Sequence, residues 1–114
     1  MKHIPILSIL FFAFITVFAC GNPDLMISLE GKLLQQYQDA KVQYYNGALS
    51  QAAAGFKAVV DAAPNFFQGK FMWGKTLFAQ GKTAEAEALF RDLTERYPMY
   101  HDARIWLIRS ELAN

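Results

Sequence analysis

Apolar side chains recur along most of this chain with the spacing of one helical face. In the clearest case they occupy positions i, i+3, i+4 and i+7, namely Ala86, Leu89, Phe90 and Leu93, so they form a single stripe along a helix. No segment alternates apolar and polar residues as a half-buried strand would. The pattern predicts an all-α fold with helices near residues 33–46, 49–62, 66–80, 83–96 and 101–113.

The pattern repeats every 34 residues. The residues that recur at this offset are two glycines, two alanines, two phenylalanines and two prolines: Gly47 and Gly81, Ala52 and Ala86, Phe56 and Phe90, Pro64 and Pro98. In each unit the glycine separates two predicted helices, and the proline follows the second helix, where it stops further helix growth. Such a period indicates stacked helix-turn-helix units.

These recurring residues resemble the tetratricopeptide repeat, a helix-turn-helix unit of the same length. In the second unit the match consists of Gly74, Leu77, Ala86, Phe90 and Pro98. The resemblance implies a short α-solenoid that covers residues 33–114. It consists of about two and a half repeats, at residues 33–66 and 67–100 with a terminal helix over 101–113.

The first nineteen residues differ from the rest and are expected to lie outside this fold. Lys2 supplies a positive start, and residues 4–19 are almost wholly apolar but too short for the roughly 20 residues of a membrane-spanning helix. Val17-Phe18-Ala19-Cys20 resembles the lipobox of bacterial lipoproteins. The resemblance implies a signal peptide over 1–19, lipid on Cys20, and a tether over 20–32. The alternatives are an ordinary secretory signal with an incidental thiol, or an uncleaved anchor.

Charge narrows the class of partner once the signal is removed. The remaining 95 residues carry ten basic and ten acidic side chains, because the removed part holds only Lys2. A neutral chain lacks the broad positive field that nonspecific nucleic-acid binding needs, and it has no polybasic cluster for lipid headgroups. A protein or peptide segment is therefore the expected partner, with no nucleic acid.

Candidates for catalysis or metal binding are few. The chain after residue 19 contains one histidine, His101, and one cysteine, Cys20, and no metal-ligand spacing. The acidic residues of the predicted helix over 83–96 are better explained as a solvated helix face than as paired general acids. We expect no enzymatic activity, no metal and no cofactor.

One stretch matches a nucleotide-binding pattern by its letters alone. Residues 69–76, GKFMWGKT, satisfy G-x-x-x-x-G-K-T, a loop that cradles phosphate with backbone amides between a buried strand and a helix. No strand is predicted before it, and Phe71, Met72 and Trp73 continue a helical stripe. The sequence therefore predicts a helix here and no nucleotide binding.

The first helices of successive units carry a ladder of cations. Lys41, Lys75 and Arg109 are 34 residues apart, and each has an apolar residue four positions earlier, which a helix places on the same face. In the resembled fold the first helices line a concave groove. The expected partner-binding groove consists of Tyr37, Lys41, Tyr44, Phe71, Lys75, Phe78, Ile105 and Arg109. It suits an extended or helical segment with a carboxylate and apolar anchors. The alternative is that the aromatic rings pack between helices and the cations are only solvated.

The last predicted helix has no following unit to cover it. Residues 105–108 are four consecutive apolar residues, which span more arc than one underlying helix can bury. Leu107 and Ile108 are expected to face the preceding unit, so that Trp106 remains exposed together with Leu112. Fewer than about three repeats are seldom self-sufficient. Trp106 and Leu112 therefore predict contact with a partner or with a second copy of the chain.

These features predict a protein-binding adaptor or assembly subunit, held at a bacterial envelope membrane by lipid on Cys20. Gly21 and Asn22 do not match the Asp-containing retention signal of many inner-membrane lipoproteins, so we expect the periplasmic face of the outer membrane. Two alternatives stay open: a dedicated subunit of an outer-membrane assembly or pilus-secretion machine, and a structural scaffold whose repeats only self-associate.

Overall fold

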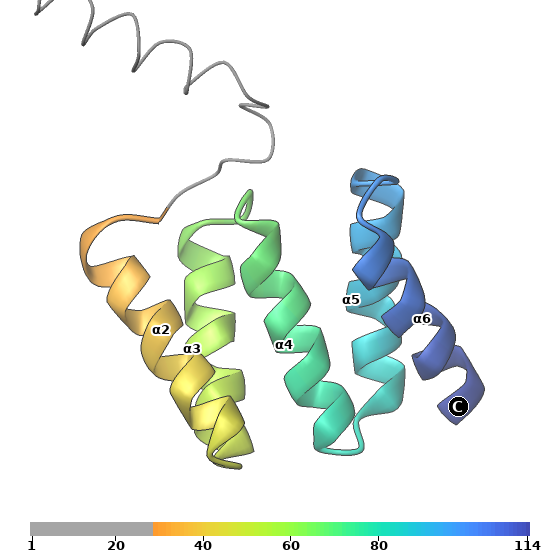
Figure 1. Ribbon diagram of the computed structural model, residues 1–114, viewed down its shortest axis with the longest axis horizontal. Coiled ribbons are helices and arrows are strands. Elements are labelled where there is room, and N and C mark those ends of the chain that lie inside the picture. The colour runs from red at the N-terminus through yellow and green to blue at the C-terminus, as the bar shows by residue number, and fades with distance from the viewer. Residues whose placement is uncertain (1–28) are drawn as a thin grey trace, which may run out of the picture.

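The computed structural model describes residues 29–114, which form five helices in a row (Figure 1). Their bounds are α2 Gly31–Tyr45, α3 Leu49–Ala62, α4 Phe67–Ala79, α5 Thr83–Arg96 and α6 His101–Ala113. Within these described residues there is no strand, so the all-α solenoid fold is confirmed. The expected signal peptide and the lipidation site Cys20 lie outside the described residues.

The helix bounds agree closely with the hydrophobic pattern. α3, α5 and α6 begin and end at the predicted residues, and α4 is one residue shorter at each end. α2 begins at Gly31, two residues before the expected start of the repeat domain. Leu29, just ahead of α2, is buried and packs with Val59 and Phe66, so the chain contacts the repeat core before its first helix starts.

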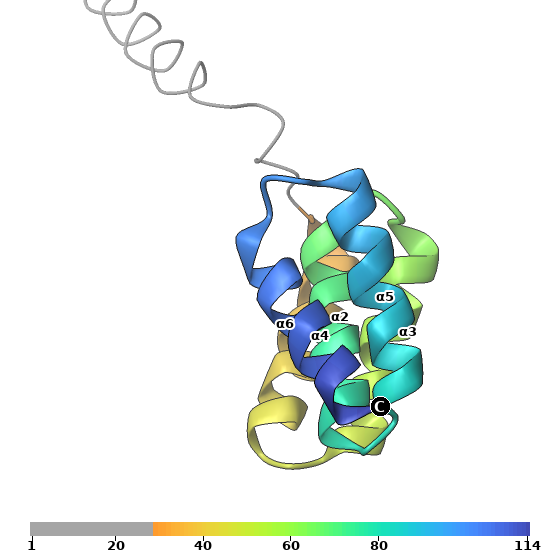
Figure 2. The same ribbon diagram turned by 90° about the vertical axis from the view of Figure 1, so that its right-hand side faces the viewer.

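The helices form two layers. α2, α4 and α6 lie in one layer, and α3 and α5 lie in the other (Figure 2). Each helix packs mainly on its neighbours in sequence, and α4 also contacts both α2 and α6. This is the arrangement of stacked helix pairs, in which α2 with α3 and α4 with α5 are the two complete units and α6 is the first helix of a third.

The two turns inside the units have the same geometry. Gly47 and Gly81 have φ values of +83° and +82°, a left-handed conformation that residues other than glycine adopt with difficulty. The residue after each glycine hydrogen-bonds to a carbonyl in the last turn of the preceding helix. Ala48 N–H donates to the Gln43 carbonyl at 2.8 Å, and Lys82 N–H donates to the Leu77 carbonyl at 2.9 Å. This is the Schellman ending of a helix, and it explains why glycine recurs at this offset.

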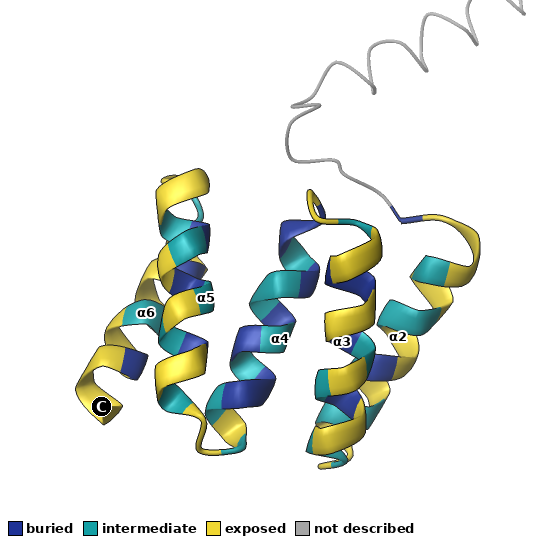
Figure 3. Cartoon of the chain, turned by 180° about the vertical axis from the view of Figure 1, so that it is seen from behind, coloured by how far each residue is buried: buried dark blue, intermediate teal, exposed yellow. Residues whose placement is uncertain are grey.

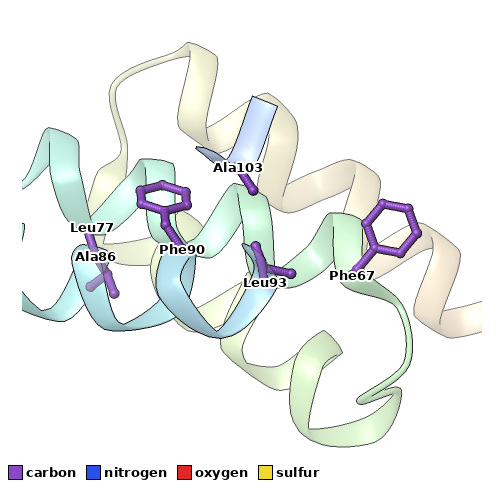
Figure 4. Packing of buried hydrophobic residues seen from close by; sticks show 6 residues of the cluster. All are labelled: Phe67, Leu77, Ala86, Phe90, Leu93 and Ala103. Atoms are coloured by element: carbon purple, nitrogen blue, oxygen red, sulfur yellow. The ribbon is translucent and has the colours of Figure 1, made fainter. Parts of the chain in front are cut away.

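The core follows the predicted apolar stripes. Phe56 and Phe90 are fully buried, and each is the centre of packing for one unit. The larger cluster is shown in Figure 4 and consists of Phe67, Leu77, Ala86, Phe90, Leu93 and Ala103. It joins α4, α5 and α6, so α6 shares the core of the second unit. The faces of α3 and α5 that point away from this core are largely exposed (Figure 3).

Small residues set how closely the helices of one unit approach. A Cβ added to Gly74 would lie 2.8 Å from the ring of Phe90, and one added to Gly55 would lie 2.9 Å from the Cβ of Ala40. Both distances are shorter than the roughly 3.5–4.0 Å of an ordinary carbon contact. Ala40 and Gly74 occupy equivalent positions in the two units, so a small first-helix residue at this position permits close packing of the second helix.

A hydroxyl pair shows that the third unit continues the repeat. Thr76 and Ser110 are both fully buried and stand 34 residues apart. The Thr76 hydroxyl donates to the Met72 carbonyl at 2.7 Å, and the Ser110 hydroxyl to the Trp106 carbonyl at 2.8 Å. Each hydroxyl is satisfied by its own helix, as burial of a polar group requires. The equivalence places Trp106 where the second unit has Met72.

Candidate protein-binding face

The structure brings the predicted cations onto one face of the α2, α4 and α6 layer, and Lys75 lies at its centre. The Lys75 Nζ is 5.5 Å from the ring centroid of Tyr44 on α2, 5.5 Å from that of Phe71 on α4, and 5.4 Å from that of Trp106 on α6. Three consecutive first helices therefore surround one ammonium group with aromatic rings. Each such contact contributes about 0.5–1 kcal/mol at an exposed site, so the lysine is held in place.

The other two cations have similar surroundings on either side. The Lys41 Nζ lies 5.5 Å from the ring centroid of Tyr37, and the Arg109 Cζ lies 4.8 Å from that of Trp106. Hereafter the cation–aromatic face means these three cations and the rings that they contact: Lys41, Lys75, Arg109, Tyr37, Tyr44, Phe71 and Trp106.

These cations have no carboxylate partner among residues 29–114. The ion pairs of that region involve Lys57, Lys70, Arg91 and Arg96 instead. α4, which carries Lys75, contains no aspartate or glutamate at all. Aromatic rings attract a cation through their quadrupole but do not neutralise its charge. The face therefore keeps a net positive charge that an anionic group can satisfy.

Two predicted groove residues, Tyr37 and Phe71, also pack between helices. The Tyr37 ring centroid is 5.8 Å from that of Phe56 and 4.9 Å from that of Phe66. The Phe71 ring centroid is 5.9 Å from that of Phe90 and 5.1 Å from that of Tyr100. Both side chains are half-buried. The alternative that these rings pack between helices therefore holds for Tyr37 and Phe71, and in addition a lysine ammonium group lies over each ring.

Burial also affects the phenol groups of this face. It raises the pKa of Tyr37 and of Tyr44, with a smaller contribution from the nearby Tyr45. Burial also raises the pKa of Tyr100, which packs on Phe71 from beside the face. All three phenols therefore stay neutral near pH 7 and act as uncharged hydrogen-bonding groups.

The remaining predicted groove residues differ in their surroundings. Phe78 packs edge-to-face on Trp106, with ring centroids 5.4 Å apart. Ile105 is 48% exposed, unlike its half-buried counterpart Phe71, because none of the described helices covers this side of α6. Phe78 is thus part of the inter-helix packing, and Ile105 lies toward the uncovered outer side of α6.

The expectation that Trp106 is exposed is wrong. Trp106 is half-buried and packs on Phe78 of α4 and Phe90 of α5, with ring centroids 5.4 and 5.9 Å away. Ile108, which was expected to face the preceding unit, is 50% exposed, whereas Leu107 packs on the core and Leu112 is 82% exposed. Trp106 is inward because it takes the position of the buried Met72 in the repeat.

Sequence reasoning missed two contributors to the surroundings of Lys75. The sequence predicts Tyr44 in the groove but not next to Lys75, and it predicts Trp106 in a separate interface. The 34-residue register contained the signal for Trp106, since Met72 lies in the predicted stripe of the preceding first helix. Its proximity to Lys75 depends on how α4 and α6 stack, which no spacing along the chain reveals.

The opposite layer carries most of the paired charges. Burial alone would raise the pKa of Asp92, but hydrogen bonds from Lys70 at 2.7 Å and Arg96 at 2.9 Å outweigh it and lower that pKa. Hydrogen bonds from Arg91 and Asn114 lower the pKa of Glu87. A hollow of about 430 Å³ lies here and another of about 340 Å³ lies between α3 and α5. The first hollow is lined largely by alanines and paired charged residues, and the second combines small residues with Trp73, Leu77 and Gln80. Neither hollow gathers several aromatic rings around a cation, as the cation–aromatic face does.

The nucleotide-loop pattern is helical in the structure. Residues 69–76 all lie within α4, so their backbone amides are engaged in the helix. Gly69 is buried beside Phe66 and Val59, and the Thr76 hydroxyl is bonded to the Met72 carbonyl. These groups are not arranged to cradle a phosphate. Residues 29–114 also contain no cluster of three or more potential metal ligands and no helix long and apolar enough to span a bilayer.

Comparison with known proteins gives one family. A model of the family described as the second ARM domain of tetratricopeptide repeat protein 21 matches residues 12–110. No curated protein and no solved structure matches the chain. The family match spans all five helices apart from the last residues of α6.

Proposed function

The chain belongs to the helical-repeat family described as the second ARM domain of tetratricopeptide repeat protein 21, and from this premise we propose that it is a non-catalytic adaptor that binds a protein segment on the cation–aromatic face. Helical-repeat domains generally act as protein-interaction modules, because stacked units present a long preformed surface. A preformed surface lowers the ordering cost of binding.

The observation that carries this proposal is the surroundings of Lys75. Its ammonium group lies within 5.5 Å of three ring centroids from three helices, and no carboxylate of residues 29–114 pairs with it. A partner carboxylate that reaches Lys75 would gain a charge-assisted hydrogen bond in a partly apolar setting. Apolar side chains of the same segment would contact the exposed parts of the aromatic rings of this face. The ligand class is therefore an extended or helical segment with carboxylates and apolar anchors.

The proposed setting is the bacterial cell envelope, with the domain facing the periplasm at the outer membrane. The support is the sequence Val17-Phe18-Ala19-Cys20, which resembles a lipobox, and the absence of an acidic residue directly after Cys20. Lipid on Cys20 would leave Gly21 to Ser28 as a short tether between the membrane and Leu29. An adaptor in this position would meet partners that lie close to the membrane surface.

Photo-crosslinking in intact cells tests whether the face contacts another protein. A photoreactive phenylalanine analogue is placed at Tyr44 in the full-length chain, where it keeps the aromatic shape, and at exposed Ala88 on α5 as the control. We expect a discrete adduct with a second protein from position 44 and none from position 88. Adducts of equal yield from both positions, or self-adducts alone from position 44, would contradict the proposal.

A charge-removal variant tests the chemistry of the same face. Replacing Lys41, Lys75 and Arg109 together with glutamine should lower the yield of the Tyr44 adduct at least fivefold. Lys41 and Lys75 are half-buried, and the three cations make five ring contacts of about 0.5–1 kcal/mol each, so the variant should melt at a lower temperature. The yields are therefore compared at a temperature where circular dichroism shows equal helicity for both proteins. A triple variant that forms the adduct as well as the wild type would show that the cations are only solvated.

A further inference from the structure

The outer side of α6 is apolar although no helix within residues 29–114 covers it. Ile105, Ile108 and Leu112 are 48%, 50% and 82% exposed, and their i, i+3, i+7 spacing aligns them in one stripe. The opposite side of α6, with buried Ala103 and Ser110, packs on the preceding unit. α6 is thus apolar on two opposite sides, which is typical of a helix with neighbours on both.

Another repeat helix is poorly suited to cover this stripe. Ile108 stands at the position of Ala40 and Gly74, the small residues that let the second helix of each unit approach closely. At Gly74 a single added Cβ would already lie 2.8 Å from the ring of Phe90. An isoleucine at this position holds a neighbouring helix farther away, so the stripe fits a surface other than the second helix of a third unit.

The charges beside the stripe are arranged to match a second copy of the same helix. One flank carries Arg104 and Glu111, and the other carries Asp102 and Arg109. All four residues are exposed, and Glu111 also pairs with Arg91 of its own chain at 3.1 Å. The members of each pair are seven residues apart, about 10.5 Å along a helix. When two α6 helices run antiparallel about a two-fold axis, each flank meets the same flank of the other copy. A base then lies opposite an acid on both sides.

We propose that α6 binds α6 of a second copy in an antiparallel, two-fold symmetric contact whose axis passes midway between Ile105 and Ile108. About this axis Ile105 of one copy lies opposite Ile108 of the other, and on each flank the acid lies within about 3 Å, measured along the helix, of the opposing base. A contact made by one helix from each copy falls well below about 1,200 Å², the range of weak and transient complexes. The dimer is therefore reversible. The proposed dimer contact does not depend on the proposed function, although Arg109 belongs both to the cation–aromatic face and to one charged flank.

Photo-crosslinking of the purified full-length chain in detergent tests this contact. The photoreactive residue replaces Leu112, whose 82% exposure leaves room for the change, and isotopically light and heavy chains are mixed before irradiation. Cleavage after Arg104 and Arg109 separates peptides 97–104, 105–109 and 110–114. We expect light–heavy adducts that join 110–114 of one copy to 97–104 or 105–109 of the other. No light–heavy adduct, or adducts only between two 110–114 peptides, would overturn the proposal.

A charge exchange tests the flanks independently of the apolar stripe. Arg104→Glu copies and Glu111→Arg copies each place like charges opposite one another, so each should lose at least fivefold in adduct yield alone. Mixed together they place a base opposite an acid on both sides of the axis and should regain the wild-type yield. Equal yields for all three samples would overturn the antiparallel register.

A matched pair of substitutions tests the stripe. Ile108→Asp should lower the adduct yield at least tenfold with unchanged helicity, since Ile108 is half exposed. Val42→Asp makes a similar change at an exposed apolar residue of α2 and should leave the yield unchanged. The reverse order of effects would place the contact on α2 and contradict the proposal.

Discussion

The contact between α2 and α3 makes a sharp prediction for Gly55→Ala. A methyl group at Gly55 would lie 2.9 Å from the Cβ of Ala40, and Ala40 is fully buried in the middle of α2. Neither Cβ can move without its backbone, so the two helices must separate by roughly 0.5–1 Å to reach ordinary contact distance. Overpacking of this kind costs about 1–3 kcal/mol.

Helix propensity opposes this cost, so the change in the free energy of unfolding for Gly55→Ala is the difference between the two effects. Alanine stabilises a helix interior by about 1 kcal/mol relative to glycine. The expected result is therefore a net loss of about 1 kcal/mol in the free energy of unfolding, measured by urea titration of the full-length chain with far-ultraviolet circular dichroism. A net gain of about 1 kcal/mol, the value expected from propensity alone, would refute the close approach.

A double variant supplies the control for Gly55→Ala. Ala40→Gly alone should destabilise the chain by about 2 kcal/mol, because it removes a buried methyl group and adds a flexible residue to α2. Ala40→Gly with Gly55→Ala moves the methyl group from one helix to the other and should return the stability to near the wild-type value. Simple additivity of the two single changes would show that the residues are not in contact.

Three further changes have expected outcomes. Asp92→Asn should lower the free energy of unfolding by about 1 kcal/mol at pH 7. Because the pKa of Asp92 is lowered in the folded state, its stabilisation is fully present above the unfolded-state pKa near 3.9 and is lost as the pH falls through the folded-state pKa. The urea midpoints of wild type and variant should therefore converge in acid. Trp106→Ala should destabilise by about 2 kcal/mol, roughly half the cost at a fully buried site, because Trp106 packs on Phe78 and Phe90; an unchanged midpoint would contradict that packing. Cys20→Ala should abolish metabolic incorporation of a lipid precursor, and persistent label on the variant would exclude lipid at Cys20.

Much of the fold could be predicted because each unit repeats its own local signals. Gly47 and Gly81 end the first helices in the same left-handed turn, and the apolar stripes around Phe56 and Phe90 define the second helices. These signals act over a few residues, where backbone conformation and side-chain spacing decide the structure. Helix bounds therefore followed from the sequence within a few residues.

The surroundings of α6 were harder to predict because the sequence of this helix alone does not determine which of its sides is buried. Four apolar residues in succession from Ile105 leave the buried side undetermined when the helix is read alone. The repeat register explains Trp106, which aligns with the buried Met72 and turns inward. Ile108 aligns with Gly74, which Phe90 of α5 covers, and is exposed because none of the described helices covers the same side of α6. The three rings around Lys75 come from three different helices, so their meeting depends on the stacking of units and not on any spacing in the chain.

The proposed function requires that Lys75, which three aromatic rings surround, binds an anionic group of a partner protein. The most direct measurement compares Lys75→Gln with Lys57→Gln in the cell, by the yield of the adduct formed from the photoreactive residue at Tyr44. Lys57 lies on α3, in the opposite layer, and is paired with Asp61 at 2.9 Å, so it matches the chemical change at a remote site. We predict that Lys75→Gln lowers the adduct yield at least fivefold and that Lys57→Gln leaves it unchanged. Equal yields from wild type and both variants would contradict the claim.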